Sequence, residues 1–357
     1  MKTSYFLVAG LLAIGFSSCQ KEPQSSPVPT IDGIEKAGIM ARPVGPFNQL
    51  FTRYSGWSGG DQGYSIRLPD GRDLWLFGDS FIDTVFADRT RPSSPLVRNA
   101  YVVQQGNQLT TLNQTVGGVV QPIVATQDPS EWFWPGDGFV SGNSLYIFQQ
   151  RMKNQGSGVF GFAQTGVDLA RFSLPDLTLQ EVTPFTYAND IAWGMAVMED
   201  GDYVYIYGTK SQQYNKYIQV ARTPIATPFS TLEFWNGTVW TTDDASTVSI
   251  RNDVSQSYSV FKHAGKYYLL SQEGFLGPDI NMYRGNSPTG PFQRKQLVAT
   301  TPVPASTWTY NALAHPQYIT AQGDLLINYS INVHNFFDLF QNADHYRPIF
   351  FRARGWE

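Results

Sequence analysis

The sequence has few charged residues and almost no cysteine. Only 15% of its 357 residues are charged, and Cys19 is the single cysteine. A disulfide bond within the chain is therefore excluded. The formal net charge is −4, without any cluster of lysines and arginines, and this argues against nucleic-acid binding because nucleic-acid binders are basic. A hydroxyl-rich ligand suits this composition better, and we expect an oligosaccharide or polysaccharide partner.

The apolar run near the N-terminus is too short to cross a bilayer. It extends from Tyr5 to Phe16, follows the positive start Met1-Lys2 and precedes Ser17-Ser18-Cys19. Such a segment is typical of a signal peptide, here residues 1–18. The small residues before the cysteine resemble a bacterial lipobox, which implies cleavage before Cys19 and lipidation of its thiol. Ordinary secretion with a spare cysteine is the alternative.

The segment after Cys19 is polar and rich in proline. Residues 20–30 read QKEPQSSPVPT, a composition that cannot bury a core and predicts a disordered tether. We therefore expect the lipidated cysteine and tether over residues 19–40 and one domain over residues 41–357. The expected location is the bacterial cell envelope, periplasmic or on the outer surface. There the protein would be a monomer held to the membrane through its lipid alone.

Turn residues and aromatic residues are abundant. The chain has 32 glycines and 22 prolines, and 15% of its residues are aromatic, which is typical of an all-β protein with many short strands. The stretch over residues 61–81, DQGYSIRLPDGRDLWLFGDSF, contains two β-rich segments joined by Pro69-Asp70-Gly71. Proline presets φ and glycine accepts positive φ, so this tripeptide predicts a tight turn between two strands.

The same two-strand unit recurs along the chain. Aligning the units places their turn glycines at Gly71, Gly142, Gly201, Gly265 and Gly323. Repeats at this spacing with several strands each predict a five-bladed β-propeller; a β-sandwich with accidentally similar hairpins is the alternative. We expect residues 41–57 to add an outer strand to the first unit. Residues 347–353 are expected to close the ring against the first blade.

Aromatic residues fall at equivalent positions of these units. Eight residues before the turn glycines stand Gly63, Trp134, Trp193, Ser257 and His315. At the mouth of a propeller funnel, Trp134, Trp193 and His315 would form a platform on which sugar rings stack. The two tryptophans could instead be wedges between blades. Asp137, Tyr258 and Asn311 are further candidates for substrate binding.

Acidic residues occupy a second set of equivalent positions. Just before the first strand of four units lie Asp61, Glu131, Asp190 and Asp253, with Asn311 in the fifth. Asp79 and Glu273 share a later position, eight residues after the turn glycine. Crowded carboxylates raise one another's pKa, which could supply the acid and the base of glycoside hydrolysis. We expect Glu273 to be the acid and Asp61 the base; turn-capping aspartates are the alternative.

No pattern in the sequence requires a cofactor. The four histidines lack the spacing of zinc ligands. Inward-facing carboxylates in the channel would permit a structural cation, although none is required.

Several segments together resemble a known family. DQGYSIRLPDGRDLWLFGDSF, WFWPGDGF, WGMAVMEDGDYVYIYGTK and FSTLEFWNGTVW resemble a bacterial domain-of-unknown-function family of five-bladed propellers that includes endo-D-arabinanases. More distantly, the repeated hairpins and the segment SPTGPF over residues 287–292 resemble the arabinofuranosidase and β-xylosidase propeller hydrolases. The resemblance covers roughly residues 54–330, and its most specific motif is Gly-Asp-Ser-Phe at residues 78–81.

The resemblance implies hydrolysis of a furanose-containing, arabinan-like glycan by carboxylate chemistry without a cofactor. Asp61 matches the carboxylate that serves as base in the xylosidase-like propellers. The chain departs from their acid, because residues 253–257 contain Asp253 and Gln256 but no glutamate. Asp253 or Glu273 would then be the acid, unless catalysis is lost. A glycan-binding lipoprotein without catalysis and a scaffold for partner proteins are the other hypotheses.

Overall fold

The computed structural model describes residues 34–36, 38–158, 160–188, 190–212, 215–274, 276–302, 304 and 306–357. Cys19, the predicted signal peptide and most of the predicted tether lie outside these residues. Within the described ranges, no helix is both long enough and apolar enough to span a membrane.

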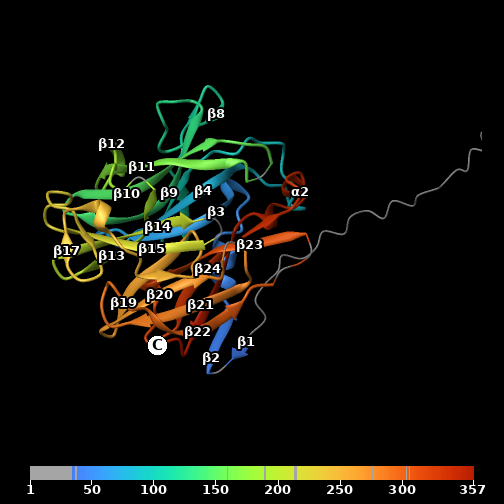
Figure 1. Cartoon of the computed structure of the whole chain (residues 1–357). Helices are drawn as coiled ribbons and strands as arrows, with labels where there is room; N and C mark the ends of the chain where they lie inside the picture. The colour runs from blue at the N-terminus through green and yellow to red at the C-terminus, as the bar shows by residue number, and fades with distance from the viewer. Residues whose placement is uncertain are drawn as a thin grey trace, which may run out of the picture.

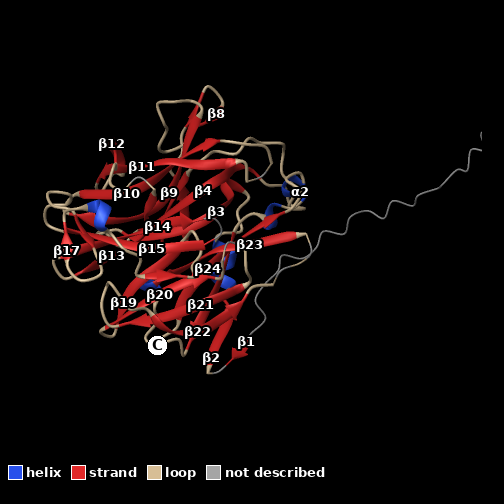
Figure 2. Cartoon of the chain, viewed as in Figure 1, coloured by secondary structure: helices blue, strands red, loops and turns tan. Residues whose placement is uncertain are grey.

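The strands form five antiparallel sheets, which confirms the predicted five-bladed β-propeller (Figure 2). Blade one contains β3 (Ser55–Arg67), β4 (Asp73–Thr84), β5 (Ala100–Gln105) and β6 (Gln108–Thr111). Blade two contains β9 (Glu131–Ser141), β10 (Ser144–Asn154), β11 (Phe162–Ser173) and β12 (Thr178–Pro184).

Blade three is the largest, because extra short strands extend it. It contains β13 (Ile191–Asp200), β14 (Tyr203–Gln212), β15 (Asn215–Pro224), β16 (Glu233–Trp235), β17 (Trp240–Thr241) and β18 (Arg251–Asn252), the last paired with β15. Blade four contains β19 (Tyr258–His263), β20 (Lys266–Gln272), β21 (Asp279–Gly285) and β22 (Gln293–Thr300). A separate hairpin consists of β7 (Thr115–Val116) and β8 (Val119–Val120).

Blade five joins both ends of the described chain, and this closes the ring. Its order is β23 (Thr307–His315), β24 (Leu325–Val333), β25 (Pro348–Arg354), β2 (Ile39–Pro43) and β1 (Ile34–Lys36). In Figure 1 the blue strand β2 lies near the C-terminus. The expectation that residues 41–57 add an outer strand to the first unit is therefore wrong, because β2 pairs with β25 of the last blade. Residues 347–353 belong to blade five and pack against the first blade as expected, with Phe350 against Trp75 at a centroid distance of 5.5 Å. A strand from the chain start completes the last blade instead, which covers the edge that β25 would otherwise expose.

Short helices occupy the connections. They are α1 (Gly45–Leu50), α2 (Asp338–Gln341) and three 3₁₀ turns at Asp244–Ser246, Pro316–Tyr318 and Ala343–His345. Asn48 in α1 stabilises the closure of the ring through two hydrogen bonds. Its side-chain amide donates to the Phe350 carbonyl at 2.8 Å, and its side-chain oxygen accepts from the Phe350 N–H at 2.8 Å.

The turn glycines stand where the sequence predicts them. All five have positive φ, at Gly71 (86°), Gly142 (56°), Gly201 (61°), Gly265 (74°) and Gly323 (81°). Each turn joins the innermost strand of a blade to the second strand, and residues other than glycine seldom adopt this conformation. The repeat seen in the sequence is therefore the inner hairpin of each blade.

The inner strands β3, β9, β13, β19 and β23 follow one another around the central channel, each in contact with the next. Four of them are irregular. The ladder register shifts between Gln62 and Tyr64 in β3 and between Trp193 and Ala196 in β13. A similar shift separates Tyr310 from Leu313 in β23, and β9 has one opposite Ile147 and Gln149. Each bulge changes which side chains face the channel.

Candidate active site

One large cavity, of about 740 Å³, opens where the inner strands begin. Every blade contributes to its lining. Asp61 and Asp79 come from blade one, Trp134 from blade two, Asp190 from the start of blade three and Asn311 from blade five. The structure thus brings five of the predicted site residues to one place.

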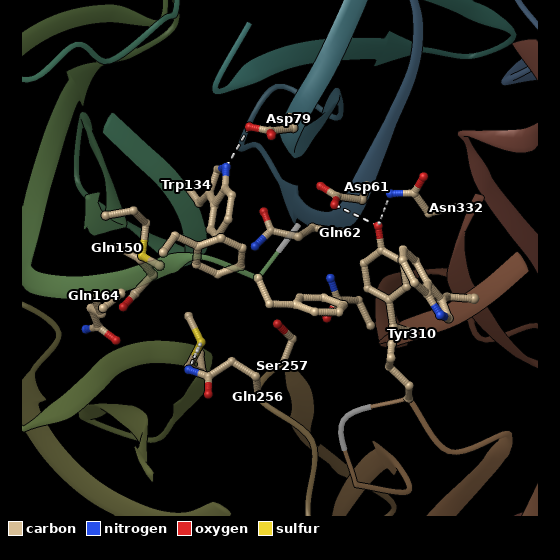
Figure 3. A pocket seen from close by; sticks show the side chains of 18 of the residues that line it. Asp61, Gln62, Asp79, Trp134, Gln150, Gln164, Gln256, Ser257, Tyr310 and Asn332 are labelled. Atoms are coloured by element: carbon tan, nitrogen blue, oxygen red, sulfur yellow. Dashed lines mark hydrogen bonds between the residues drawn. The ribbon is translucent and has the colours of Figure 1, made fainter. Parts of the chain in front are cut away.

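Asp61 lies on β3 just before the register shift and faces the cavity (Figure 3). The Tyr310 hydroxyl donates to Asp61 Oδ2 at 2.9 Å, and the Tyr346 side chain also hydrogen-bonds this carboxyl. Burial and the charge of nearby Asp79 raise the pKa of Asp61 to about 7, although the two phenols oppose the rise. Asp61 therefore exchanges its proton near neutral pH.

Asp79 lies on β4 and has stronger partners. Its Oδ1 accepts from the Trp134 indole N–H at 2.7 Å, and its Oδ2 accepts from Arg98 Nη1 at 2.8 Å. Burial raises the pKa of Asp79, and the charge of Arg98 together with the Trp134 hydrogen bond opposes this rise. The surroundings of Asp61 favour its protonated form, whereas the cation Arg98 favours the ionised form of Asp79. Burial thus raises the pKa of both carboxyls, but at Asp79 the charge of Arg98 opposes the rise.

Asp190 and Asn311 stand at the cavity rim. The Asp190 side chain is 61% exposed and pairs with Lys210 at 2.6 Å. Asn311 has a φ of 53° at the bulge of β23, a conformation that asparagine tolerates better than most residues.

Trp134 lies in the cavity wall with its ring edge against Phe162, at a centroid distance of 4.8 Å. Because its indole N–H is held by Asp79, the ring has a fixed orientation beside the carboxylates. Of the three residues predicted to form a sugar platform, Trp134 is the one that lines the cavity.

Several cavity residues were not predicted. The unpredicted polar residues include Gln62, Gln150, Gln164, Tyr310, Asn332 and Tyr346, and the aromatic ones include Phe160, Phe162, Trp308 and Phe336. Asn332 Nδ2 donates to the Tyr310 hydroxyl at 3.3 Å, which orients the phenol toward Asp61. Gln150 and Thr209 hold the same repeat position as Asp79, so the repeat could have predicted that they line the cavity. The aromatic residues that come from loops follow no repeat.

Two predicted platform residues do not reach the cavity. Trp193 is fully buried between blades, and its indole N–H donates to the Tyr187 carbonyl at 2.8 Å. His315 is buried below the cavity, where its ring nitrogens contact Ser65 Oγ at 2.6 Å and Asn328 Oδ1 at 2.8 Å. Burial lowers the pKa of His315 to about 4, so the ring is neutral. Trp193 therefore packs as a wedge between blades, which is the alternative given by the sequence analysis.

Tyr258 and Asp137 also lie away from the cavity lining. Tyr258 is completely buried in the core between blades three and four. Asp137 accepts from the backbone N–H groups of Gly138 and Val197, both at 2.8 Å. Burial raises its pKa to about 7. Asp137 thus ties the inner strands of blades two and three together, and neither residue is among those that line the cavity.

The remaining acidic candidates lie outside the cavity lining. Asp253 and Glu273 are about half exposed and share Lys295, at 3.4 Å and 3.9 Å. Glu131 accepts from Thr165 Oγ1 at 2.9 Å. Glu273 follows the end of β20, and the expectation that it faces the site beside Asp61 is wrong, since the chain turns it toward Lys295. The described residues contain no group of three or more His, Cys, Asp or Glu side chains suited to hold a metal ion.

The comparison with family models gives one match. The model described as "Domain of unknown function (DUF5005)" matches residues 45–356. The chain therefore belongs to this family. A search of curated proteins found no match.

Solved structures with a similar fold were also found. The chain is 25% identical to a candidate hydrolase of Bacteroides ovatus, with a TM-score of 0.78 over 94% of this chain and 97% of that one. The GH43_1 enzyme of Xanthomonas citri, solved with xylotriose, is 14% identical with a TM-score of 0.46 over 86% and 92%. The α-L-arabinofuranosidase of Podospora anserina, solved with cellotriose, is 12% identical with a TM-score of 0.47 over 92% and 95%.

Proposed function

We propose that this protein is a glycoside hydrolase in which Asp61 and Asp79 are the reacting carboxyl pair. The observation that carries the proposal is their shared position in one cavity with unlike environments. Asp61 has a pKa near 7 and contacts phenols, whereas Asp79 contacts Arg98. Hydrolysis of a glycosidic bond needs one protonated and one ionised carboxyl group.

In this mechanism Asp61 is the general acid. Its proton passes to the glycosidic oxygen as the bond to the anomeric carbon breaks, and a water molecule attacks that carbon. Asp79 accepts the proton of the water, so the atoms and charges balance. A pKa close to the working pH favours proton transfer in either direction. The role of base that the sequence suggested for Asp61 suits its raised pKa less well.

The cavity lining supports a sugar as ligand. Trp134 presents an aromatic surface beside the two carboxyls, and aromatic rings pack against the C–H faces of sugars. The side-chain oxygens of Gln62 and Gln150 are buried, and no described residue hydrogen-bonds them. A sugar hydroxyl entering beside them would supply the missing donor.

We further propose a furanose-containing, arabinan-like glycan as substrate and the cell envelope as location. The substrate rests on the sequence resemblance, and the location rests on the lipobox-like residues before Cys19. The similar Bacteroides ovatus structure, described as a candidate hydrolase, agrees with the reaction class.

The test is a product assay of the purified protein on arabinans, arabinoxylans and other plant and bacterial glycans. We expect the wild type to release sugars. Asp61→Asn and Asp79→Asn should each lower the rate of release by a factor of about 10² to 10⁴. Asp253→Asn is the matched control, since this carboxylate lies outside the cavity, and it should keep full activity. Wild-type rates in Asp61→Asn would overturn the assignment. Glycan retention in affinity gels without any product would favour the second candidate, a glycan-binding protein.

A further inference from the structure

The cavity has a donor-rich side that the proposed reaction does not use. Gln164 on β11, Lys216 on β15 and Gln256 before β19 line it, so that blades two, three and four each contribute one residue. Figure 3 shows Gln164 and Gln256 across the cavity from Asp61 and Asp79. The acidic pair and these two glutamines therefore face the same space from different sides.

Lys216 carries a partly buried ammonium group that contacts a hydroxyl. Its Nζ donates to Ser211 Oγ at 2.7 Å. Among the described residues no carboxylate lies within 4.0 Å of this nitrogen, whereas the neighbouring Lys210 pairs with Asp190 at 2.6 Å. Burial lowers the pKa of Lys216, because removal from water disfavours a charge without a partner.

The three aspartates that line the cavity are paired with a cation or protonated. Asp79 pairs with Arg98 and Asp190 with Lys210. Asp61 is neutral below a pH of about 7. With these groups balanced, the charge of Lys216 remains, and the donor-rich side of the cavity carries a local excess of positive charge.

The two glutamines Gln164 and Gln256, which line the same cavity, have weak partners. Gln164 Nε2 lies 3.4 Å from the Gly166 carbonyl, and Gln256 Nε2 lies 3.7 Å from the Met195 sulfur. The first contact is long for an N–H···O bond, and the thioether sulfur of the second is a weak acceptor. Both amide groups can therefore donate to a ligand at little cost.

We propose that the bound glycan carries an anionic substituent, a carboxylate or a phosphate, which Lys216 binds with the help of Gln164 and Gln256. The inference rests on the proposed function in that it takes the cavity as a sugar site. It adds an anionic substituent to the arabinan-like glycan proposed above. An anion is also oriented by the charge of Lys216, which attracts it. The glycosidic bond is thereby directed toward Asp61.

The test measures binding, so that it does not depend on turnover. Calorimetry compares matched probes with the purified full-length protein: trigalacturonate against its methyl ester, and glucose 6-phosphate against glucose. We expect an acidic probe to bind about tenfold more tightly than its neutral partner, the usual contribution of a charged hydrogen bond. The two pairs distinguish a carboxylate from a phosphate.

Three variants locate the effect. Lys216→Met should remove the preference for the acidic probe, and Lys216→Arg should keep most of it. Lys266→Met, which removes an exposed lysine hydrogen-bonded to Asn286, should leave it unchanged. The preference should also weaken as sodium chloride is added, because salt screens the pair.

The proposal is overturned if no acidic probe binds more tightly than its neutral partner, or if the preference survives in Lys216→Met. Failure of the proposed function would look different. A protein that prefers the acidic probe through Lys216 but releases no sugar from any glycan would keep this inference and lose the hydrolase. A protein that hydrolyses only neutral glycans, with equal rates in Lys216→Met, would keep the hydrolase and lose the inference.

Discussion

Tyr310 donates a hydrogen bond of 2.9 Å to Asp61, although 249 positions separate the two residues in the chain. They come from blades five and one, which meet where the ring closes. The hydrogen bond favours the ionised form of Asp61 and so opposes the rise in its pKa. Closure of the propeller is therefore coupled to the protonation of the proposed catalytic acid.

Replacement of Tyr310 by phenylalanine tests this coupling. Removal of the donor raises the pKa of Asp61 further, because the carboxylate loses a stabilising hydrogen bond. We expect the alkaline limb of the pH–rate profile to move upward by about 0.5 to 1 pH unit, which corresponds to one ordinary hydrogen bond. Tyr217→Phe, on a tyrosine outside the cavity lining, is the control. An unmoved limb would show that Asp61 is not the group that titrates there.

Arg98 should control the other limb. Its guanidinium lowers the pKa of Asp79, so Arg98→Gln should leave Asp79 protonated to a higher pH and move the acid limb of the profile upward. Arg98→Lys should restore much of the wild-type profile because it keeps the charge. Arg171→Gln removes an exposed pair with Glu181 and should change neither limb. A profile that is unaffected in Arg98→Gln would count against Asp79 as the base.

The sequence was sufficient to predict the blades, because the same local pattern recurs in each of them. A turn with a glycine at positive φ joins two β-rich segments, and Gly71 and its four counterparts follow this rule. Asp61, Asp79 and Asp190 were also found from their repeat positions, since they lie at strand ends that reach the same face.

Counting along strands failed where the strands are irregular. The bulge between Trp193 and Ala196 interrupts the alternation of side chains in β13, and Trp193 packs into the core. Glu273 failed for another reason, because residues after the end of β20 follow a loop that no periodicity describes. Tyr310 was missed since its role appears only when blades five and one are brought together.

The two tryptophans should respond differently to substitution. Trp193 is fully buried and packs against Phe234, so Trp193→Ala should lower the free energy of unfolding by about 3–5 kcal/mol. Trp134 lines the cavity, and Trp134→Ala should weaken glycan binding with a smaller loss of stability. Urea unfolding and affinity gels measure the two effects. Equal losses of stability would contradict the distinction between wedge and platform.

Ring closure can be weakened at one residue. Asn48→Ala removes both hydrogen bonds to the Phe350 backbone and leaves two main-chain groups without these partners. We expect the free energy of unfolding to fall by about 1–3 kcal/mol. Asn236→Ala, at an exposed turn within blade three, should cost less than half as much. A fall no greater than in this control would show that the Asn48 contacts do not hold the blade.

Asp61 should lower the stability of the fold at neutral and alkaline pH. Its pKa is about 7 in the folded chain, against 3.8 for an unperturbed aspartate. Between these values the folded state binds more protons than the unfolded state, so the free energy of unfolding falls as the pH rises.

The variant Asp61→Asn removes this dependence. At pH 8 we expect its free energy of unfolding to be on the order of 2 kcal/mol higher than that of the wild type. This is less than the full pKa shift of Asp61 corresponds to, because the carboxyl is partly accessible. At pH 4 the difference should nearly vanish, since Asp61 is then largely protonated in the folded wild type. Asp253→Asn, half exposed beside Lys295, should show no such growth with pH. A variant that is less stable than the wild type at pH 8 would mean that the ionised Asp61 carboxylate stabilises the fold, contrary to its raised pKa.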